Sequence, residues 1–161
     1  MSFLLAADGR DDDAEGAFQR YQAYLDATKS RFPASAYALA TSDWWFNFHD
    51  HRCPHDAWIE RIELIEAREG PRKPSRLTLC VRLLGAYHDG NIELHYPDVT
   101  AYTLSMQSGG GHRDWRYDEL RVSDAGRLIH EIEWWAAGQT GHWLIEAADL
   151  EYQWIPFEGR P

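Results

Sequence analysis

The sequence predicts an α+β domain in which an N-terminal helix packs on a strongly bent antiparallel β-sheet or a partly closed barrel. Residues 77–96 and 120–134 each alternate apolar and polar side chains at the two-residue period of a half-buried strand, and each stretch contains a glycine turn. Residues 12–30 carry apolar side chains at helical spacing. One amphipathic helix followed by antiparallel hairpins is typical of the α+β class.

Length and composition predict a single domain over residues 1–161. The chain is 44% hydrophobic and long enough to bury a core without a metal or a disulfide. Its formal net charge of -10 repels phosphate groups, which argues against nucleic-acid binding. With two cysteines, no signal-peptide pattern and no apolar run of spanning length, we expect a reduced, cytoplasmic protein that does not associate with membranes.

The helix is expected over residues 12–30. Asp12 and Glu15 have the spacing of a capping box, and Pro33 is expected to stop the helix. Its apolar stripe consists of Ala14, Phe18, Tyr21 and Leu25. We expect this stripe to cover one face or one open end of the sheet.

The β-rich part is expected over residues 44–157. Residues 34–40 fit a helix and a strand equally well, and residues 44–48 are expected to be extended. Residues 59–67 could form either element. We favour a strand, because polar and apolar side chains alternate through their middle.

The first predicted hairpin is centred on the dipeptide Asp89-Gly90, which is typical of two-residue turns. Closing the turn there places Tyr87 opposite Ile92 and puts both apolar rows on one face of the sheet. A further strand is expected over residues 99–106.

The second predicted hairpin begins a four-stranded antiparallel meander. A turn at residues 124–126 places Val122 opposite Leu128 and Leu120 opposite His130. Because His130 then falls in the inward row, we expect a neutral core imidazole with a hydrogen-bond partner and not a general base.

The meander is expected to continue through a connection at residues 136–141, which would place Trp134 opposite Trp143. Its fourth strand is predicted from an apolar row. That row consists of Leu150, Tyr152 and Trp154.

One polar box, at residues 49–56, resembles a site. His49, His51, Cys53 and His55 recur at a period of two, so an unbroken strand would place all four on one face. Imidazole and thiolate suit zinc, and these four side chains could complete a tetrahedron. The box therefore supports an alternative function as a metal-binding protein or a metal-dependent enzyme.

Pro54 favours a different interpretation of the same box. Proline removes a strand hydrogen-bond donor and commonly ends a strand. We therefore favour a structural corner without a cofactor, in which His51, His55 and Asp56 satisfy loop backbone groups.

Two adjacent tryptophan pairs, Trp44-Trp45 and Trp134-Trp135, predict an interaction surface. Neighbouring side chains on a strand point to opposite faces, so one ring of each pair must leave the main core. We expect Trp45 and Trp135 to point outward. They could be covered by the N-terminal helix, by curling of the sheet, by a second subunit or by a ligand.

The box also carries a resemblance. Residues 50–58, which end in His55, Asp56, Ala57 and Trp58, resemble a His-Asp-Ala-Trp-type box in a group of short bacterial proteins with a β-rich second half. That group has no activity to carry over. Some proteins of similar style are immunity proteins, which implies a protein partner. A looser resemblance to Sm-like barrels implies RNA binding, which the acidic charge disfavours.

These observations favour a protein-interaction or oligomerisation domain over an enzyme. It would act without catalysis, as a homodimer or as an immunity-like binder of another protein. An acidic surface with interspersed indoles suits a basic protein partner. The metal-dependent function of residues 49–56 and the Sm-like RNA-binding function stay open as alternatives.

Overall fold

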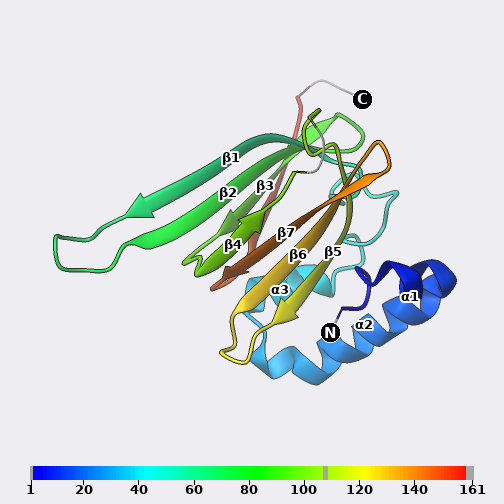
Figure 1. The fold of residues 1–161 in the computed structure, drawn as a ribbon, viewed down its shortest axis with the longest axis horizontal. Coiled ribbons are helices and arrows are strands. Elements are labelled where there is room, and N and C mark those ends of the chain that lie inside the picture. Colours follow the sequence, from blue (N-terminus) through cyan, green and yellow to red (C-terminus); the bar gives the residue numbers. More distant parts are fainter. Residues whose placement is uncertain (1, 107–108, 159–161) are drawn as a thin grey trace.

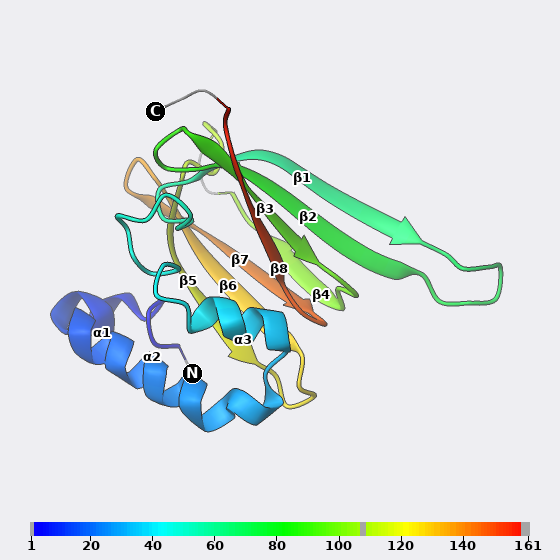
Figure 2. The same ribbon diagram turned by 180° about the vertical axis from the view of Figure 1, so that it is seen from behind.

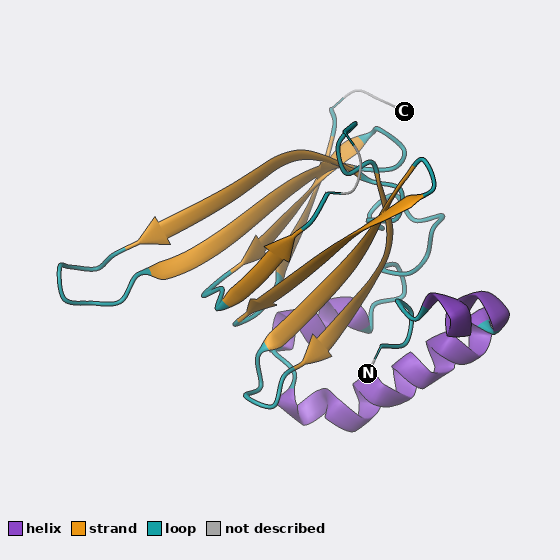
Figure 3. Ribbon diagram, viewed as in Figure 1, coloured by secondary structure: helices purple, strands orange, loops and turns teal. Residues whose placement is uncertain are grey.

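Two four-stranded antiparallel sheets face each other, and the helices gather along one side of them (Figure 1). The structure is a computed structural model that describes residues 2–106 and 109–158, apart from the side chain of Asp8. Colouring by secondary structure separates the helical layer from the strands (Figure 3). The predicted α+β class is confirmed, and the strands divide between two sheets that do not close into a barrel.

The first sheet has the strand order β1-β2-β3-β8. Its strands are β1 (Trp58–Ala67), β2 (Arg76–Leu84), β3 (Gly90–Tyr96) and β8 (Glu151–Pro156). The choice of a strand for residues 59–67 is therefore confirmed. Alternating polar and apolar residues favoured the extended form there, and β2 supplies the neighbouring strand.

The second sheet has the order β4-β7-β6-β5. Its strands are β4 (Ala101–Leu104), β5 (Asp114–Val122), β6 (Leu128–Ala136) and β7 (Gln139–Ala147). Strands β5, β6 and β7 form the first three strands of the predicted meander.

The prediction that the fourth strand of the meander pairs with β7 is wrong, because that strand, β8, belongs to the first sheet. Strand β8 pairs with β3, where Trp154 lies opposite Ile92. The chain changes sheets just after β7, where the Ala148 N–H donates to the carbonyl oxygen of Pro97. Exchange of strands between facing sheets lets both sheets contribute to one core.

The helical part contains more elements than the sequence predicted. It comprises α1 (Ala7–Asp12), α2 (Ala14–Thr28), the 3-10 turn η1 (Lys29–Arg31) and α3 (Ala34–Ala40). The expected helix is confirmed as α2. Residues 34–40, which the sequence left unassigned, are helical.

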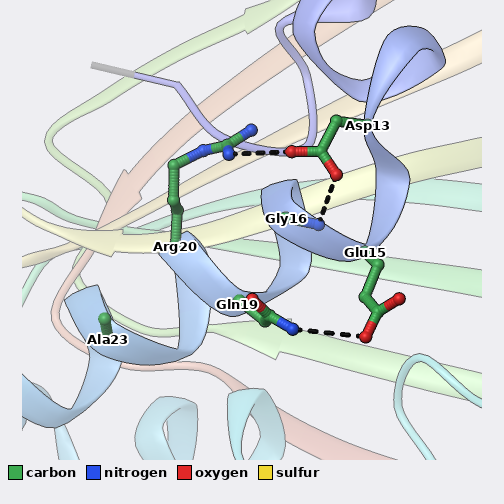
Figure 4. Close-up of a pocket in the computed structure, with 6 residues that line it drawn as sticks. All are labelled: Asp13, Glu15, Gly16, Gln19, Arg20 and Ala23. Atoms are coloured by element: carbon green, nitrogen blue, oxygen red, sulfur yellow. Dashed lines mark hydrogen bonds and ion pairs between the residues drawn. The ribbon is translucent and has the colours of Figure 1, made fainter.

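Asp13, and not Asp12, caps α2. The Asp13 carboxylate accepts the Gly16 N–H at 2.9 Å and lies 3.2 Å from the Arg20 guanidinium, as Figure 4 shows. These contacts lower the pKa of Asp13. These side chains line a shallow hollow, in which Gln19 also donates to Glu15. The polar groups of the hollow therefore largely satisfy one another, and they form the helix cap.

The hairpin registers differ in how well the sequence predicted them. Between β5 and β6, Val122 lies opposite Leu128, which confirms that prediction. Between β6 and β7, residues 137–138 alone make the turn, and both have positive φ. Trp134 therefore lies opposite Gly141, and its predicted pairing with Trp143 is wrong.

The turn between β2 and β3 is longer than predicted. Leu83 lies opposite Ile92, so the expected pairing of Tyr87 with Ile92 is wrong. Gly90 is needed for packing, because a Cβ there would come within 2.4 Å of the Trp154 ring. The apolar rows of both strands nevertheless face one side, as predicted, because the shift covers an even number of residues.

The core lies between the two sheets and extends beneath the helices. Its largest buried side chains are Trp45, Trp115, Trp134, Trp143, Tyr21 and Tyr96. In the described part of the chain, no helix has the length and apolar character needed to cross a membrane.

Candidate interaction surface

The polar box does not form the strand that the zinc hypothesis required. Residues 49–57 make consecutive turns, in which the Cys53 N–H donates to the Asp50 carbonyl and the Ala57 N–H donates to the Pro54 carbonyl. A chain of tight turns does not place alternate side chains on one face.

The four candidate zinc ligands, His49, His51, Cys53 and His55, do not converge. The Cys53 thiol donates to the Trp45 carbonyl oxygen at 2.9 Å, and burial raises its pKa to about 12, which disfavours a thiolate. His49 is exposed. Within residues 2–106 and 109–158, no group of three or more His, Cys, Asp or Glu residues could hold a metal ion.

His55 and Asp56 connect the turns to β5. The His55 ring stacks on Phe48 at 3.8 Å, and its Nδ1 donates to the Arg116 carbonyl at 2.6 Å. The backbone of Asp56 adopts a positive φ of 61°, and its N–H donates to the Trp115 carbonyl at 2.8 Å. His55 thus acts through its side chain, whereas Asp56 acts through its backbone.

His51 connects the turns to the loop between β2 and β3. Its ring stacks on Tyr87 at 4.0 Å, and its Nδ1 contacts the Asp89 carboxylate. The Tyr87 hydroxyl also donates to the Phe48 carbonyl at 3.2 Å. The contact partner of His51 is therefore a carboxylate, and not the loop backbone that the sequence predicted.

The tryptophan pairs behave differently from each other. Trp135 is 46% exposed and Trp134 is buried, as alternation on a strand requires. Trp45 is buried, so its predicted place on the interaction surface is wrong. The reason is that residues 44–48 form turns, and partly exposed Trp44 instead packs on the Tyr152 ring at 4.8 Å.

A buried polar cluster joins the two sheets. His130 Nε2 lies 3.2 Å from the Asp118 carboxylate, and its Nδ1 lies 2.9 Å from the Tyr96 hydroxyl. The indole N–H groups of Trp45 and Trp115 donate to Asp118 at 2.9 and 3.2 Å. His130 is therefore a hydrogen-bonded core histidine, as predicted. Asp118 was not predicted as a member of this cluster, although alternation from Leu120 places it in the inward row of β5.

The β5 edge of the second sheet is closed by α2. The Tyr21 hydroxyl donates to the Leu120 carbonyl and accepts the Leu120 N–H, both at 2.9 Å. The Tyr24 hydroxyl accepts the Val122 N–H at 2.9 Å. These hydroxyls replace the hydrogen bonds of a missing neighbouring strand.

The β8 edge of the first sheet lies beside α3 and the turns that follow it (Figure 2). The Tyr152 hydroxyl donates to the Arg52 carbonyl at 2.6 Å, and Trp44 covers its ring. At the outer edge of the second sheet, β4 is only four residues long. A short edge strand offers little backbone for pairing.

Strand β1 is the long and exposed edge. It has ten residues and pairs with β2 alone, and the β1–β2 hairpin projects past the other strands in both ribbon views (Figures 1 and 2). Its exposed large apolar side chains are Trp58, Ile62, Leu64 and Ile65. We refer to these side chains and the outer backbone of β1 as the β1 edge. An apolar edge strand that is unpaired on one side presents free backbone groups to which another strand can add.

Together these features define, for the described residues, an α+β domain with two facing antiparallel sheets and a long exposed edge strand, β1. Comparisons with protein-family models, with curated proteins and with solved structures find no match for this chain. The geometry of the β1 edge is therefore the observation on which a functional proposal depends.

Proposed function

We propose that this protein is a protein-binding domain that accepts a partner strand along the β1 edge. The observation that carries the proposal is the concentration of exposed apolar side chains on β1. Among the described residues, nine large apolar side chains are exposed, and four of them lie on this strand. Single exposed apolar residues are ordinary, whereas a group on one edge marks an interaction site.

Strand addition would satisfy both chemical features of this edge. Unpaired backbone N–H and C=O groups along β1 would gain partners, which supplies affinity. The apolar side chains would leave water, at a gain of roughly 25 cal/mol for each Å² of apolar area buried. Pairing and burial on one strand favour a protein segment in extended conformation over a small molecule.

The sequence-based expectations enter this proposal with changes. Trp135 remains exposed on β6 and offers a secondary contact, whereas Trp45 is removed from the surface. The immunity-like role and the cytoplasmic location stay predictions. Neither the zinc alternative nor the RNA-binding alternative has an observation in its favour comparable to the β1 edge.

A photo-crosslinking residue at position 64 tests the proposal in living cells. Leu64 is 43% exposed on β1, so its replacement by benzoylphenylalanine leaves the core intact. We expect a crosslinked protein band from position 64. The matched control is the same replacement at exposed Gln19 on α2, which should give none. An absence of crosslinks at position 64 would overturn the proposed function.

A further inference from the structure

We infer that the partner strand is β1 of a second copy of this chain, paired antiparallel about a two-fold axis at Ile62. This inference rests on the proposed function, and it names the partner. The β1-β2-β3-β8 sheets of the two copies would then join into one continuous sheet across the axis. A closed two-fold dimer uses the same patch on both copies, so β1 must be complementary to itself.

The pairing of β1 with β2 fixes which side chains share a face. Ile62 and Leu64 lie opposite Val81 and Leu79, whose side chains point into the core, so they belong to the inner row. Arg61 alternates with Ile62 and belongs to the outer row. The outer row consists of Trp58, Arg61, Glu63, Ile65 and Ala67. In a continuous antiparallel sheet, inner residues must meet inner residues.

Charge selects the register. With the axis at Ile62, Arg61 of each copy lies opposite Glu63 of the other, which gives two opposite-charge pairs. Moving the axis to Arg61 or to Glu63 would place identical charges opposite each other. In the isolated chain, the side chains of Arg61 and Glu63 are exposed, and the Arg61 Nε lies 3.8 Å from the Glu63 Oε2. Both side chains are therefore accessible to a second copy.

The irregularity in β1 completes the match. The register with β2 shifts between Ile59 and Arg61, so Glu60 is an extra residue, and it turns toward Arg82 at 3.2 Å. Skipping Glu60 brings Ile59 opposite Leu64 of the second copy.

The same shift brings Trp58, whose indole N–H donates to Asp114 at 2.7 Å within its own chain, opposite Ile65 of the second copy. Ile62 then meets Ile62 across the axis. Each exposed apolar side chain of β1 therefore faces an apolar side chain across the axis. Two copies with a net charge of -10 repel each other overall, so this local complementarity must outweigh the repulsion.

Reversal of single charges tests the register with the full chain. In sedimentation velocity at micromolar concentrations, we expect the wild-type protein at twice the chain mass. R61E and E63R should each raise the dimer Kd at least tenfold, because each places like charges opposite each other twice. Arg20→Glu on α2 makes the same charge change away from β1 and should leave the Kd unchanged.

A mixture of R61E and E63R gives the decisive readout. The R61E copy carries glutamate at positions 61 and 63, and the E63R copy carries arginine at both positions. A mixed dimer then places opposite charges across the axis, so it should form although neither variant pairs with itself. Its formation also shows that both variants are folded. Variants that stay dimeric alone, or a mixture that stays monomeric, would overturn the inferred register.

The two proposals fail in distinguishable ways. If the wild-type protein is monomeric at 100 µM while position 64 crosslinks to a different protein, self-pairing is overturned and the protein-binding function stands. A monomer without crosslinks at position 64 overturns both.

Discussion

Asp118 is the shared hydrogen-bond acceptor of the buried polar cluster. Its carboxylate is buried and bonds to His130 and to the indole N–H groups of Trp45 and Trp115. A buried donor that loses its acceptor costs about 1–3 kcal/mol. The carboxylate thus holds together the turns after α3 and the two strands β5 and β6.

We expect Asp118→Ala to lower the free energy of unfolding by about 3 kcal/mol or more, because three donors lose their acceptor. Urea denaturation followed by tryptophan fluorescence measures the change. Asp124→Ala removes a fully exposed carboxylate and should stay within about 0.5 kcal/mol of wild type. An Asp118→Ala protein as stable as the control would show that the cluster contributes little.

The Cys53 thiol makes the stability of the fold depend on pH. Burial raises its folded pKa from 9.0 to about 12, so the folded state holds the thiol proton more tightly than the unfolded state. The resulting stability is complete below pH 9 and is lost as pH rises toward 12. Between pH 9 and pH 10 the loss is about 1 kcal/mol.

Unfolding of wild type and Cys53→Ala at these two pH values measures the effect. The variant should lose about 1 kcal/mol less than wild type over that interval, because it lacks the titrating thiol. At pH 8, iodoacetamide should label Cys80 before Cys53, because the Cys53 thiol is buried. Equal losses in both proteins would contradict the assigned cause.

Single residues could be predicted from the sequence where they lie on regular strands, and not where they lie in turns. His130 was predicted correctly, since its place in an apolar row requires a buried partner. Trp45 was assigned outward by an alternation rule that holds only for strands. The inward place of Asp118 follows from alternation with Leu120, but its contact with Trp45 does not, because Trp45 lies in turns whose side-chain directions no periodicity specifies.

At the scale of elements, α2 protects the β5 edge through tyrosine hydroxyls. We expect Tyr21→Phe to lower the free energy of unfolding by about 1–3 kcal/mol, because both backbone groups of Leu120 lose their partner. Chemical denaturation measures the loss. Tyr102→Phe, on the exposed β4, is the matched control and should be neutral. Equal stability of both variants would show that α2 does not cap this edge.

Glu119 fixes the N-terminal segment on the outer face of the second sheet. Its Oε1 accepts the backbone N–H groups of Phe3, Leu4 and Leu5, and the side chain is fully buried. Arg10, a few residues later, is also buried and donates to the Leu4 carbonyl at 2.9 Å. The segment thus behaves as an additional covering layer.

We expect Glu119→Ala to release this segment and to expose Arg10 to trypsin. Cleavage after Arg10 should become faster on the order of tenfold, because the segment can open without losing hydrogen bonds to the Glu119 carboxylate. Mass spectrometry of limited digests identifies the cut. Glu69→Ala, at the exposed hairpin tip, serves as the control. Unchanged cleavage after Arg10 would contradict this role for Glu119.

The types of element could be predicted from the sequence more fully than their pairing. Period-two patterns correctly identified β2, β3, β5 and β6. The pairing of β8 with β3 could not be predicted, because alternation states that a strand has an apolar face and not which sheet it joins. The register predicted from a two-residue turn at Asp89-Gly90 is wrong, because Gly90 lies in β3 and makes room for the Trp154 ring.

Across the whole molecule, the surface that a partner can reach depends on which sheet edges are covered by other elements. The sequence predicted a strand at residues 59–67 but did not indicate whether its apolar side chains would be covered. The apolar side chains of β1 are exposed, because the β1–β2 hairpin projects past its neighbours. The strand predicted at residues 99–106 is also shorter than expected, since β4 covers only Ala101–Leu104. Exposure of β1 therefore depends on element lengths that local patterns do not specify.

Amide hydrogen exchange of the full chain at 1 and 100 µM tests the pairing of β1 most directly. If β1 pairs with a second copy, its outward amides should exchange more slowly at the higher concentration, while those of β4 stay unchanged. Exchange along β1 that is equally fast at both concentrations would contradict pairing of β1 with a second copy.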